Sequence, residues 1–221
     1  MTDPVDRLPV LPVYVAADES TSMRPFARDL NAGVDALHRA LLSEPMAAAR
    51  VRICLLGFAD GPVVRLPLTD LRDVESMPEL KPTGMTRYGT LFRFLAEQIP
   101  DDVATLRESG LRVMRPVVFF LTDGLPTDDW PAAHHELTSR HLSRTAPHIV
   151  ACGLGAADAP VVAAVATEPG FGFVPGEALD VPRAVDRFFS ALTLSVVKSA
   201  RVLPGLVVEV PEGFQIAIDE I

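Results

Sequence analysis

Three oxygen-bearing side chains follow an apolar segment near the beginning of the chain. Residues 10–17 are almost entirely apolar, and Asp18, Ser20 and Ser22 come next at every second position. Carboxylates and hydroxyls are hard oxygen donors, which small divalent cations prefer, whereas zinc sites favour thiolate and imidazole. The pattern therefore predicts one side of a metal site at the end of a buried strand.

Thr86 and Asp123 are candidates to complete this site. Asp123 ends the most apolar segment of the chain, and Thr86 lies between a turn at Gly84 and a predicted helix. Neighbouring parallel strands are roughly 4.8 Å apart, so two strand-terminal carboxylates would repel each other unless a cation lay between them. An open coordination position on that cation would attract one more carboxylate, supplied by a partner protein. We predict that five residues bind Mg²⁺, with Mn²⁺ and Ca²⁺ as alternatives: Asp18, Ser20, Ser22, Thr86 and Asp123.

The rest of the sequence predicts the scaffold that must hold these residues. Apolar segments typical of buried strands alternate with amphipathic helix patterns. We predict strands at residues 10–17, 50–58, 61–68, 115–124, 147–155 and 170–176, and helices at 26–41, 88–99, 159–166, 181–199 and after Pro131. This order predicts an α/β fold, a doubly wound and mostly parallel sheet of about six strands with helices on both faces. Residues 61–68 follow a short turn and contain prolines, so we expect one antiparallel edge strand there.

The chain is expected to contain one main domain and a tail. Residues 1–200 contain all the alternating strands and helices, and we assign them to a single domain. Residues 201–221 contain two short alternating segments around Pro211, Glu212 and Gly213. This tail is predicted to form a β-hairpin or a strand that binds a partner.

Composition excludes several classes of partner. The formal net charge is −9 and no cluster of Lys and Arg is present, so we expect neither nucleic acid nor an anionic membrane as a partner. The first fifteen residues lack a signal-peptide pattern and no apolar segment reaches the roughly 20 residues that span a bilayer, so a cytoplasmic location is expected. Cys54 and Cys152 lie in apolar segments and are predicted to be buried free thiols.

The candidate site resembles one found in a known family. Asp18-x-Ser20-x-Ser22, then Thr86, then Asp123 before a glycine resemble in order and context the metal-ion-dependent adhesion site (MIDAS) of von Willebrand factor type A (vWA) domains. The segments LPVYVAADESTSM, TGMTRYG and VVFFLTDGLPTDDW are similar to the bacterial tellurite-resistance members. The resemblance covers about residues 8 to 200. It implies that the two serines and the threonine contact the ion directly, and that the two aspartates act largely through water.

Two positions depart from the family pattern. Thr21 stands where the family often has glycine, and Met85 stands where a second glycine usually precedes the threonine. If either loop needs a positive φ angle, a residue with a Cβ atom would be strained there. Metal affinity would then be lower, or the loop would be rearranged.

Several of these residues also have simpler interpretations. Ser20 and Ser22 are favourable helix caps, Asp128 and Asp129 would cap the helix before Pro131 or join the rim of the site, and Trp130 would pack against that helix or contact a partner. Within the helix after Pro131, no two histidines or cysteines are three or four positions apart, the spacing of zinc ligands. We therefore interpret four histidines as surface residues: His134, His135, His141 and His148.

The residues favour a non-catalytic, metal-dependent protein–protein interaction module, and we expect no enzymatic activity. The resemblance implies a setting of bacterial stress response or tellurite resistance, with kinase or phosphatase components as partners. One alternative is a haloacid-dehalogenase-like phosphohydrolase with Asp18 as nucleophile, which would need a second carboxylate where Ser20 stands and a lysine that is absent between Thr86 and Asp123. Another is a vestigial metal site, with residues 202–221 binding a partner by strand addition.

Overall fold

The computed structural model describes residues 9–155, 157–202 and 204–217. Its centre is an eight-stranded sheet in the order β3-β2-β1-β5-β6-β7-β8, with β4 paired to the beginning of β1. The strands are β1 (Pro9–Asp18), β2 (Val51–Phe58), β3 (Pro62–Asp70), β4 (Arg112–Val113), β5 (Val117–Thr122), β6 (His148–Gly153), β7 (Gly172–Pro175) and β8 (Phe214–Ile216).

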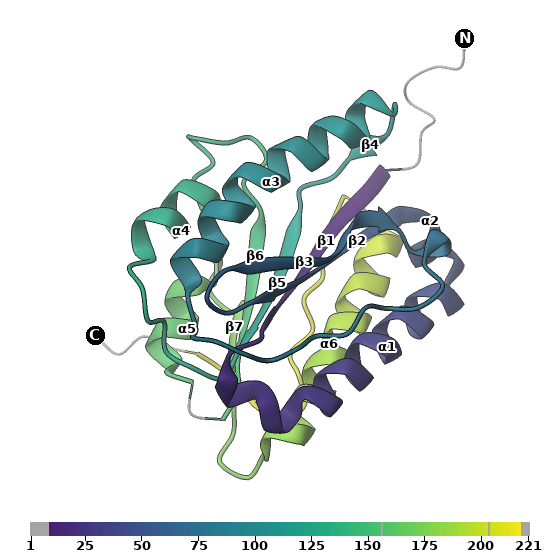
Figure 1. Cartoon of the computed structure of the whole chain (residues 1–221). Coiled ribbons are helices and arrows are strands. Elements are labelled where there is room, and N and C mark those ends of the chain that lie inside the picture. The colour runs from purple at the N-terminus through teal and green to yellow at the C-terminus, as the bar shows by residue number, and fades with distance from the viewer. Residues whose placement is uncertain (1–8, 156, 203, 218–221) are drawn as a thin grey trace.

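Helices cover both faces of this sheet, as Figure 1 shows. One face packs against α1 (Ala27–Ser43), α2 (Pro45–Arg50) and α6 (Val181–Val202). The other packs against α3 (Tyr88–Glu108), α4 (Pro131–Thr138) and α5 (Ala159–Val165). Two short 3₁₀ helices, η2 (Thr21–Phe26) and η3 (Leu71–Asp73), follow β1 and β3. No helix in the described part of the chain is both long enough and apolar enough to cross a membrane.

The central strand β1 is buried on both faces because its side chains alternate between two apolar layers. Val13, Val15 and Ala17 belong to the layer under α1 and α6, while Tyr14 and Ala16 belong to the layer under α3. A parallel strand with helices on both sides has no solvent-facing side chain, and this explains its almost unbroken apolar sequence. Two polar residues follow at its end, Asp18 and Glu19, and both are buried.

The predicted fold class is confirmed, including the antiparallel strand at one edge, β3, which pairs with β2. At the opposite edge, β8 pairs antiparallel with β7. Residues 214–216 of the predicted tail therefore belong to the same sheet as the domain, and residues 218–221 lie outside the described residues. The division at residue 200 remains a prediction. Cys54 and Cys152 are buried free thiols, as expected.

One strand and one α-helix were not predicted, and neither were the 3₁₀ helices η2 and η3. The two-residue strand β4 is too short for any periodic pattern, and α2 begins at Pro45, directly after the end of α1. Proline is favoured in the first helical turn because its missing N–H has no partner there in any case. The sequence pattern indicates that α1 ends before this proline, and it does not indicate that a new helix begins.

Candidate metal site

The site lies where β1 and β5 end side by side. These strands are parallel neighbours, with Ala17 opposite Leu121. Asp18 and Asp123 therefore lie side by side at the carboxyl ends of the two strands. Asp18 has no exposed surface. One of its carboxylate oxygens accepts the Ser20 backbone N–H at 2.7 Å and the other accepts the Thr122 hydroxyl at 2.7 Å. The first carboxylate is therefore held rigidly from two directions.

A chain of hydrogen bonds links the other predicted ligands on these two strands. The Ser20 and Ser22 hydroxyls are 2.8 Å apart, and the Ser22 hydroxyl donates to Asp123 Oδ1 at 2.8 Å. Ser20 occupies the N-cap position of η2, but its side chain makes no capping hydrogen bond. The simpler interpretation of Ser20 as a helix cap is therefore wrong, because its hydroxyl bonds to another side chain of the candidate site.

Thr86 reaches the site from the irregular segment 74–87. Its carbonyl accepts both the backbone N–H and the hydroxyl of Thr127, each at 2.8 Å, so this segment is tied to the loop after β5. A Cβ atom added to Gly124 would lie 3.3 Å from Thr86 Oγ1, which shows how closely the two loops approach. Among the described residues the Thr86 hydroxyl has no hydrogen-bond partner, although the residue is only 6% exposed. The Thr86 hydroxyl is therefore a candidate ion ligand beside the loop that carries Asp123.

The two carboxylates are electrostatically unfavourable without a cation. Burial raises the pKa of Asp18 to about 6, and the charge of Asp123 contributes to the same shift. Burial also raises the pKa of Asp123, against the hydrogen bond from Ser22. Two acids with raised pKa values, Asp18 buried and Asp123 half-buried, form together with the hydroxyls a donor set that fits a hard divalent ion. The described residues contain no group of three or more His, Cys, Asp and Glu side chains that could hold a metal, so any ion here would depend on the hydroxyls.

The two departures from the family pattern cause no backbone strain. Every described residue with a positive φ angle is a glycine, and in this loop it is Gly84, with φ of 86°. The Thr21 backbone N–H and hydroxyl both donate to the Gly84 carbonyl, at 3.0 and 2.9 Å. The Met85 backbone N–H donates to Asp60 Oδ1 at 3.2 Å. Neither Thr21 nor Met85 has a positive φ angle, so the condition for strain at these positions is not met. One glycine makes the turn, and side chains hold it.

Asp128 caps a different helix from the one expected. Its two carboxylate oxygens accept the backbone N–H groups of Gly89 and Thr90, at 3.1 and 3.2 Å. These groups lie in the first turn of α3, which begins directly after the Thr86 segment. Sequence proximity to Pro131 suggested a cap for α4, whereas the fold places the loop after β5 against the beginning of α3.

The aromatic and histidine residues near α4 are packed more deeply than expected. The Trp130 ring makes an edge contact with His134 of α4, with centroids 5.5 Å apart, so the packing interpretation is confirmed, and it also contacts Tyr88 and Phe92 of α3, at 6.1 and 5.9 Å. His134 and His148 are half-buried, and the assignment of both to the surface is wrong. The His134 Nε2 atom lies 2.8 Å from the Val165 carbonyl oxygen, within hydrogen-bond distance. Its place on the inner side of α4 was not apparent from spacing.

Three supporting residues were missed by sequence reasoning: Glu19, Asp60 and Thr122. Thr122 directly precedes Asp123 at the end of a strand, where successive side chains point to opposite faces of the sheet. This position could have indicated that Thr122 supports the site. Glu19 and Asp60 bind backbone groups of distant segments, and no local pattern reports such contacts.

Comparison with known proteins identifies the fold. Neither the scan against protein-family models nor the search of curated proteins finds a match. Solved structures do match: the pilus adhesin SpaC from Lactobacillus rhamnosus GG has a TM-score of 0.66 at 16% identity, over 88% of this chain and 30% of that one. Proximal thread matrix protein 1 from the mussel byssus, with a zinc-occupied MIDAS motif, has a TM-score of 0.61 at 15% identity, over 85% and 48%. A von Willebrand factor type A protein from Catenulispora acidiphila has a TM-score of 0.55 at 15% identity, over 85% and 42%.

The chain has the vWA fold. It spans less than half the length of each of these three proteins. At these identities the likeness concerns the arrangement of strands and helices, and a fold of this kind hosts many functions. What this vWA-fold chain does must therefore be argued from its own site.

Proposed function

We propose that this chain is a non-catalytic, metal-dependent protein-binding module. One observation carries the proposal: Asp18, Ser20, Ser22 and Asp123 form a continuous hydrogen-bonded set at the ends of two neighbouring strands, with the unpartnered Thr86 hydroxyl beside them. The donors are all oxygen atoms, and among the described residues neither the buried Asp18 nor the half-buried Asp123 pairs with a basic side chain. The zinc-occupied MIDAS of the mussel protein and the adhesin role in the name of SpaC support the proposal.

Each residue has a distinct part in the proposed site. Ser20, Ser22 and Thr86 would hold the ion directly, while Asp18 and Asp123 would act through water and keep the serines in place. When bound, the ion would supply a coordination position that a carboxylate of the partner can fill. Mg²⁺ is the proposed ion because the donors are few and hard.

The geometry disfavours the alternative of a phosphohydrolase. A nucleophilic carboxylate must reach its substrate, but Asp18 has no exposed surface and both its oxygens accept hydrogen bonds. Ser20, which stands where such an enzyme needs a general acid, has its hydroxyl engaged with Ser22. We infer that Asp18 organises the site and does not attack a substrate.

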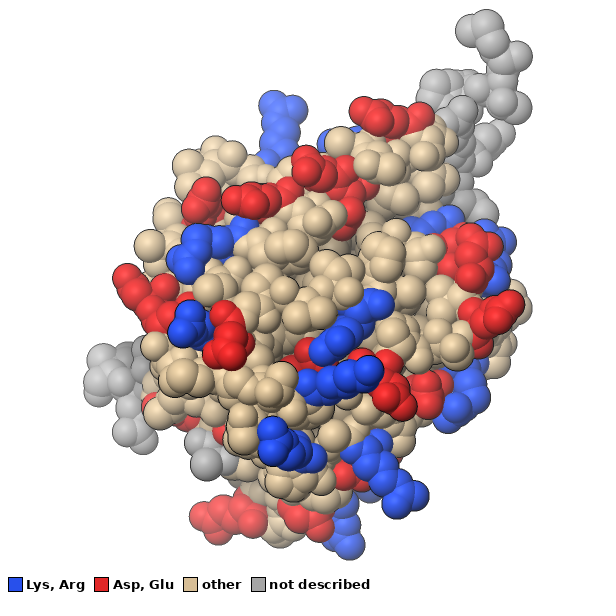
Figure 2. Space-filling model, viewed as in Figure 1, with Lys and Arg blue, Asp and Glu red and all other residues tan. Residues whose placement is uncertain are grey.

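Most of the proposed setting rests on the sequence resemblance alone. A part in bacterial stress response or tellurite resistance, and partners among kinase or phosphatase components, follow from that resemblance, whereas the cytoplasmic location is proposed from the hydropathy pattern of the sequence. The charge distribution adds only that basic and acidic side chains are interspersed over the face seen in Figure 2. The partner's defining feature in this proposal is an exposed carboxylate.

Metal-dependent stabilisation and partner capture test the proposal. Mg²⁺ at about a hundred times its dissociation constant should raise the free energy of unfolding by about 2.7 kcal/mol, and Asp18→Asn should abolish this gain. The immobilised wild-type chain should retain a cytosolic partner in Mg²⁺ and release it in EDTA, and Asp18→Asn should retain none. Asp129→Asn, an exposed aspartate outside the donor set, is the matched control and should behave as wild type. A partner retained equally in EDTA and by Asp18→Asn would contradict the proposal.

A further inference from the structure

We propose that Glu19 is a positioning residue that holds the Thr86 segment in its metal-binding arrangement before any ion arrives. The inference rests on the proposed function, because it concerns the same site. Glu19 stands between Asp18 and Ser20 and is only 2% exposed. Side chains alternate along a strand, so Asp18 turns toward Thr122 while Glu19 turns toward the segment that carries Thr86.

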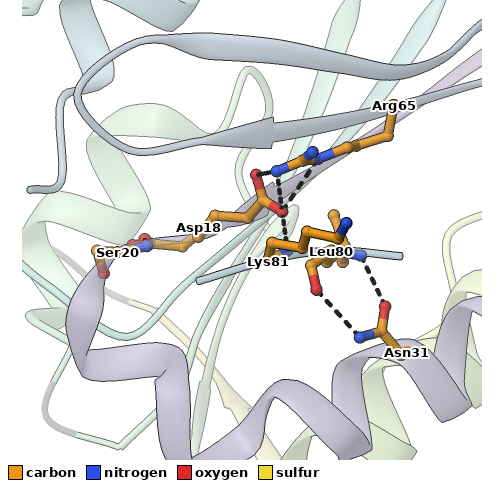
Figure 3. A network of polar contacts seen from close by, with 7 residues as sticks. Asp18, Ser20, Asn31, Arg65, Leu80 and Lys81 are labelled. Atoms are coloured by element: carbon orange, nitrogen blue, oxygen red, sulfur yellow. Dashed lines mark hydrogen bonds and ion pairs between the residues drawn. The ribbon is translucent and has the colours of Figure 1, made fainter. Parts of the chain in front are cut away.

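The Glu19 carboxylate occupies a site built for it. Arg65 on β3 donates to both carboxylate oxygens through Nη2, at 2.9 and 3.0 Å, and to one of them through Nε at 3.2 Å. The Lys81 backbone N–H donates to Glu19 Oε1. Gly57 on β2 leaves room for the carboxylate, because a Cβ atom there would overlap it. Figure 3 shows Arg65 and Lys81 meeting the chain between Asp18 and Ser20.

Asn31 on α1 holds the neighbouring residue of the same segment. Its side-chain carbonyl accepts the Leu80 backbone N–H at 2.8 Å, and its amide donates to the Leu80 carbonyl at 3.1 Å. Figure 3 shows this two-bond contact opposite Lys81. Leu80 itself is buried in the core. Glu19 and Asn31 together therefore fix residues 80–81 from two sides; we call this arrangement the Glu19–Asn31 clasp.

The clasp connects the two segments that must meet around the ion. One is the end of β1, with Asp18 and Ser20, and the other is segment 74–87, which has no helix or strand of its own. Ordering such a segment when an ion binds would cost conformational entropy and weaken the affinity. Because the clasp orders the segment in advance, Thr86 is already in place.

A second ion pair that also involves β3 provides a matched control. Arg52 on β2 and Asp70 on β3 are 3.0 Å apart, with side chains only 12% and 14% exposed. This pair is as buried as that of Glu19 and Arg65, whose side chains are 3% and 21% exposed. It has no hydrogen bond to segment 74–87 among the described residues. Breaking it should lower stability without moving Thr86.

Isothermal titration calorimetry with Mn²⁺ on the full chain tests the clasp. Glu19→Gln and Asn31→Ala should each weaken Mn²⁺ binding by about 10- to 100-fold, the effect typical of residues that orient metal ligands. Arg52→Leu should lower the melting temperature but leave Mn²⁺ affinity unchanged. Asp18→Asn should abolish binding. Asn31 is half-exposed, so its variant tests the clasp even where Glu19→Gln does not fold.

Hydrogen exchange distinguishes the clasp from a general contribution to stability. If Glu19 only stabilised the fold, the amides of segment 74–87 would not be selectively affected. In the metal-free wild type the amides of residues 80–86 should be protected, and Mn²⁺ should change them little. In Glu19→Gln the same amides should exchange rapidly without the ion and regain protection at saturating Mn²⁺. In Arg52→Leu they should behave as in wild type.

The possible outcomes separate this inference from the proposed function. A wild-type chain that binds no Mn²⁺ would overturn both. If the wild type binds, Asp18→Asn does not, and both clasp variants bind as tightly as wild type, only the clasp is overturned. An equal loss of affinity in Arg52→Leu would also overturn it, because the effect would then follow from lower stability in general.

Discussion

Single side chains around the site act mainly by holding backbone. Thr21 and Asp60 bind the two sides of the turn at Gly84, and neither could have been assigned this role from its neighbours in sequence. The Thr21 hydroxyl donates to the Gly84 carbonyl and so holds the turn. The loop therefore does not need a second glycine at position 21. The departure from the family pattern is thus a different way of fixing the same loop.

Replacing Thr21 by glycine should therefore destabilise this protein. Thr21→Gly removes the hydroxyl bond to the Gly84 carbonyl and adds freedom to the unfolded chain, and we expect a loss of about 1 kcal/mol in the free energy of unfolding. Mn²⁺ affinity should not rise. Urea denaturation in a chelator and a Mn²⁺ titration give the two quantities, and Thr21→Ser, which keeps the hydroxyl, is the control. A tighter ion site in Thr21→Gly would show that the Cβ atom obstructs the loop.

Helices and strands with strong apolar patterns were predicted well, and those set by packing were not. The central strands and α1 have patterns that only a buried element explains. The beginning of α3 at residue 88 was predicted, but its capping by Asp128, from a loop 38 or 39 residues later in the chain, was not, nor was its extension to Glu108. The inner side of α4 depends on contacts of His134 with Phe92 and with the Val165 carbonyl.

His134 should make stability depend on pH. Burial lowers the pKa of His134 below its ordinary value of 6.5, and the neighbouring His135 adds to this effect. The unfolded chain therefore takes up a proton that the folded chain resists, so the stability present above pH 6.5 is lost as the pH falls below it. We expect His134→Gln, which can still donate to Val165, to lose less stability than wild type between pH 7.5 and 5. Thermal denaturation across that range measures the difference. The exposed His135→Gln should follow the wild-type curve more closely, and a His134→Gln curve parallel to wild type would refute the assignment.

The whole molecule is a parallel sheet closed at each edge by an antiparallel strand. β3 comes from the hairpin after β2, and β8 comes from the end of the described chain. The connection to β8 is held along α6, where Ser199 bonds both backbone groups of Val207 and Ser195 accepts the Glu209 N–H. Leu206 and Val208 pack against the core under α1 and α6.

Removal of residues 202–221 should accordingly weaken the whole domain. Burial of Phe214 alone contributes roughly 2 kcal/mol, and α6 would lose the partners of Ser195 and Ser199. We expect a chain ending at Arg201 to unfold at a clearly lower temperature than wild type. A chain ending at Ala217 is the control and should keep β8 and its stability. Unchanged unfolding of the shorter chain would support a domain that ends near residue 200.

The local pattern of the chain was enough to predict the class of fold and the antiparallel edge at β3, and it selected five candidate metal ligands whose role remains a prediction. The fold prediction succeeds because apolar periodicity indicates burial. Strands buried on both faces are almost entirely apolar, so polar residues at their ends stand out as candidates for a binding site. Segment 74–87 lacks any period, so its path could not be predicted. That path depends on side chains 49 and 62 positions away, Asn31 and Glu19, which meet it only after the sheet and α1 have formed. A hydrogen bond between distant segments leaves no trace in the sequence around either partner.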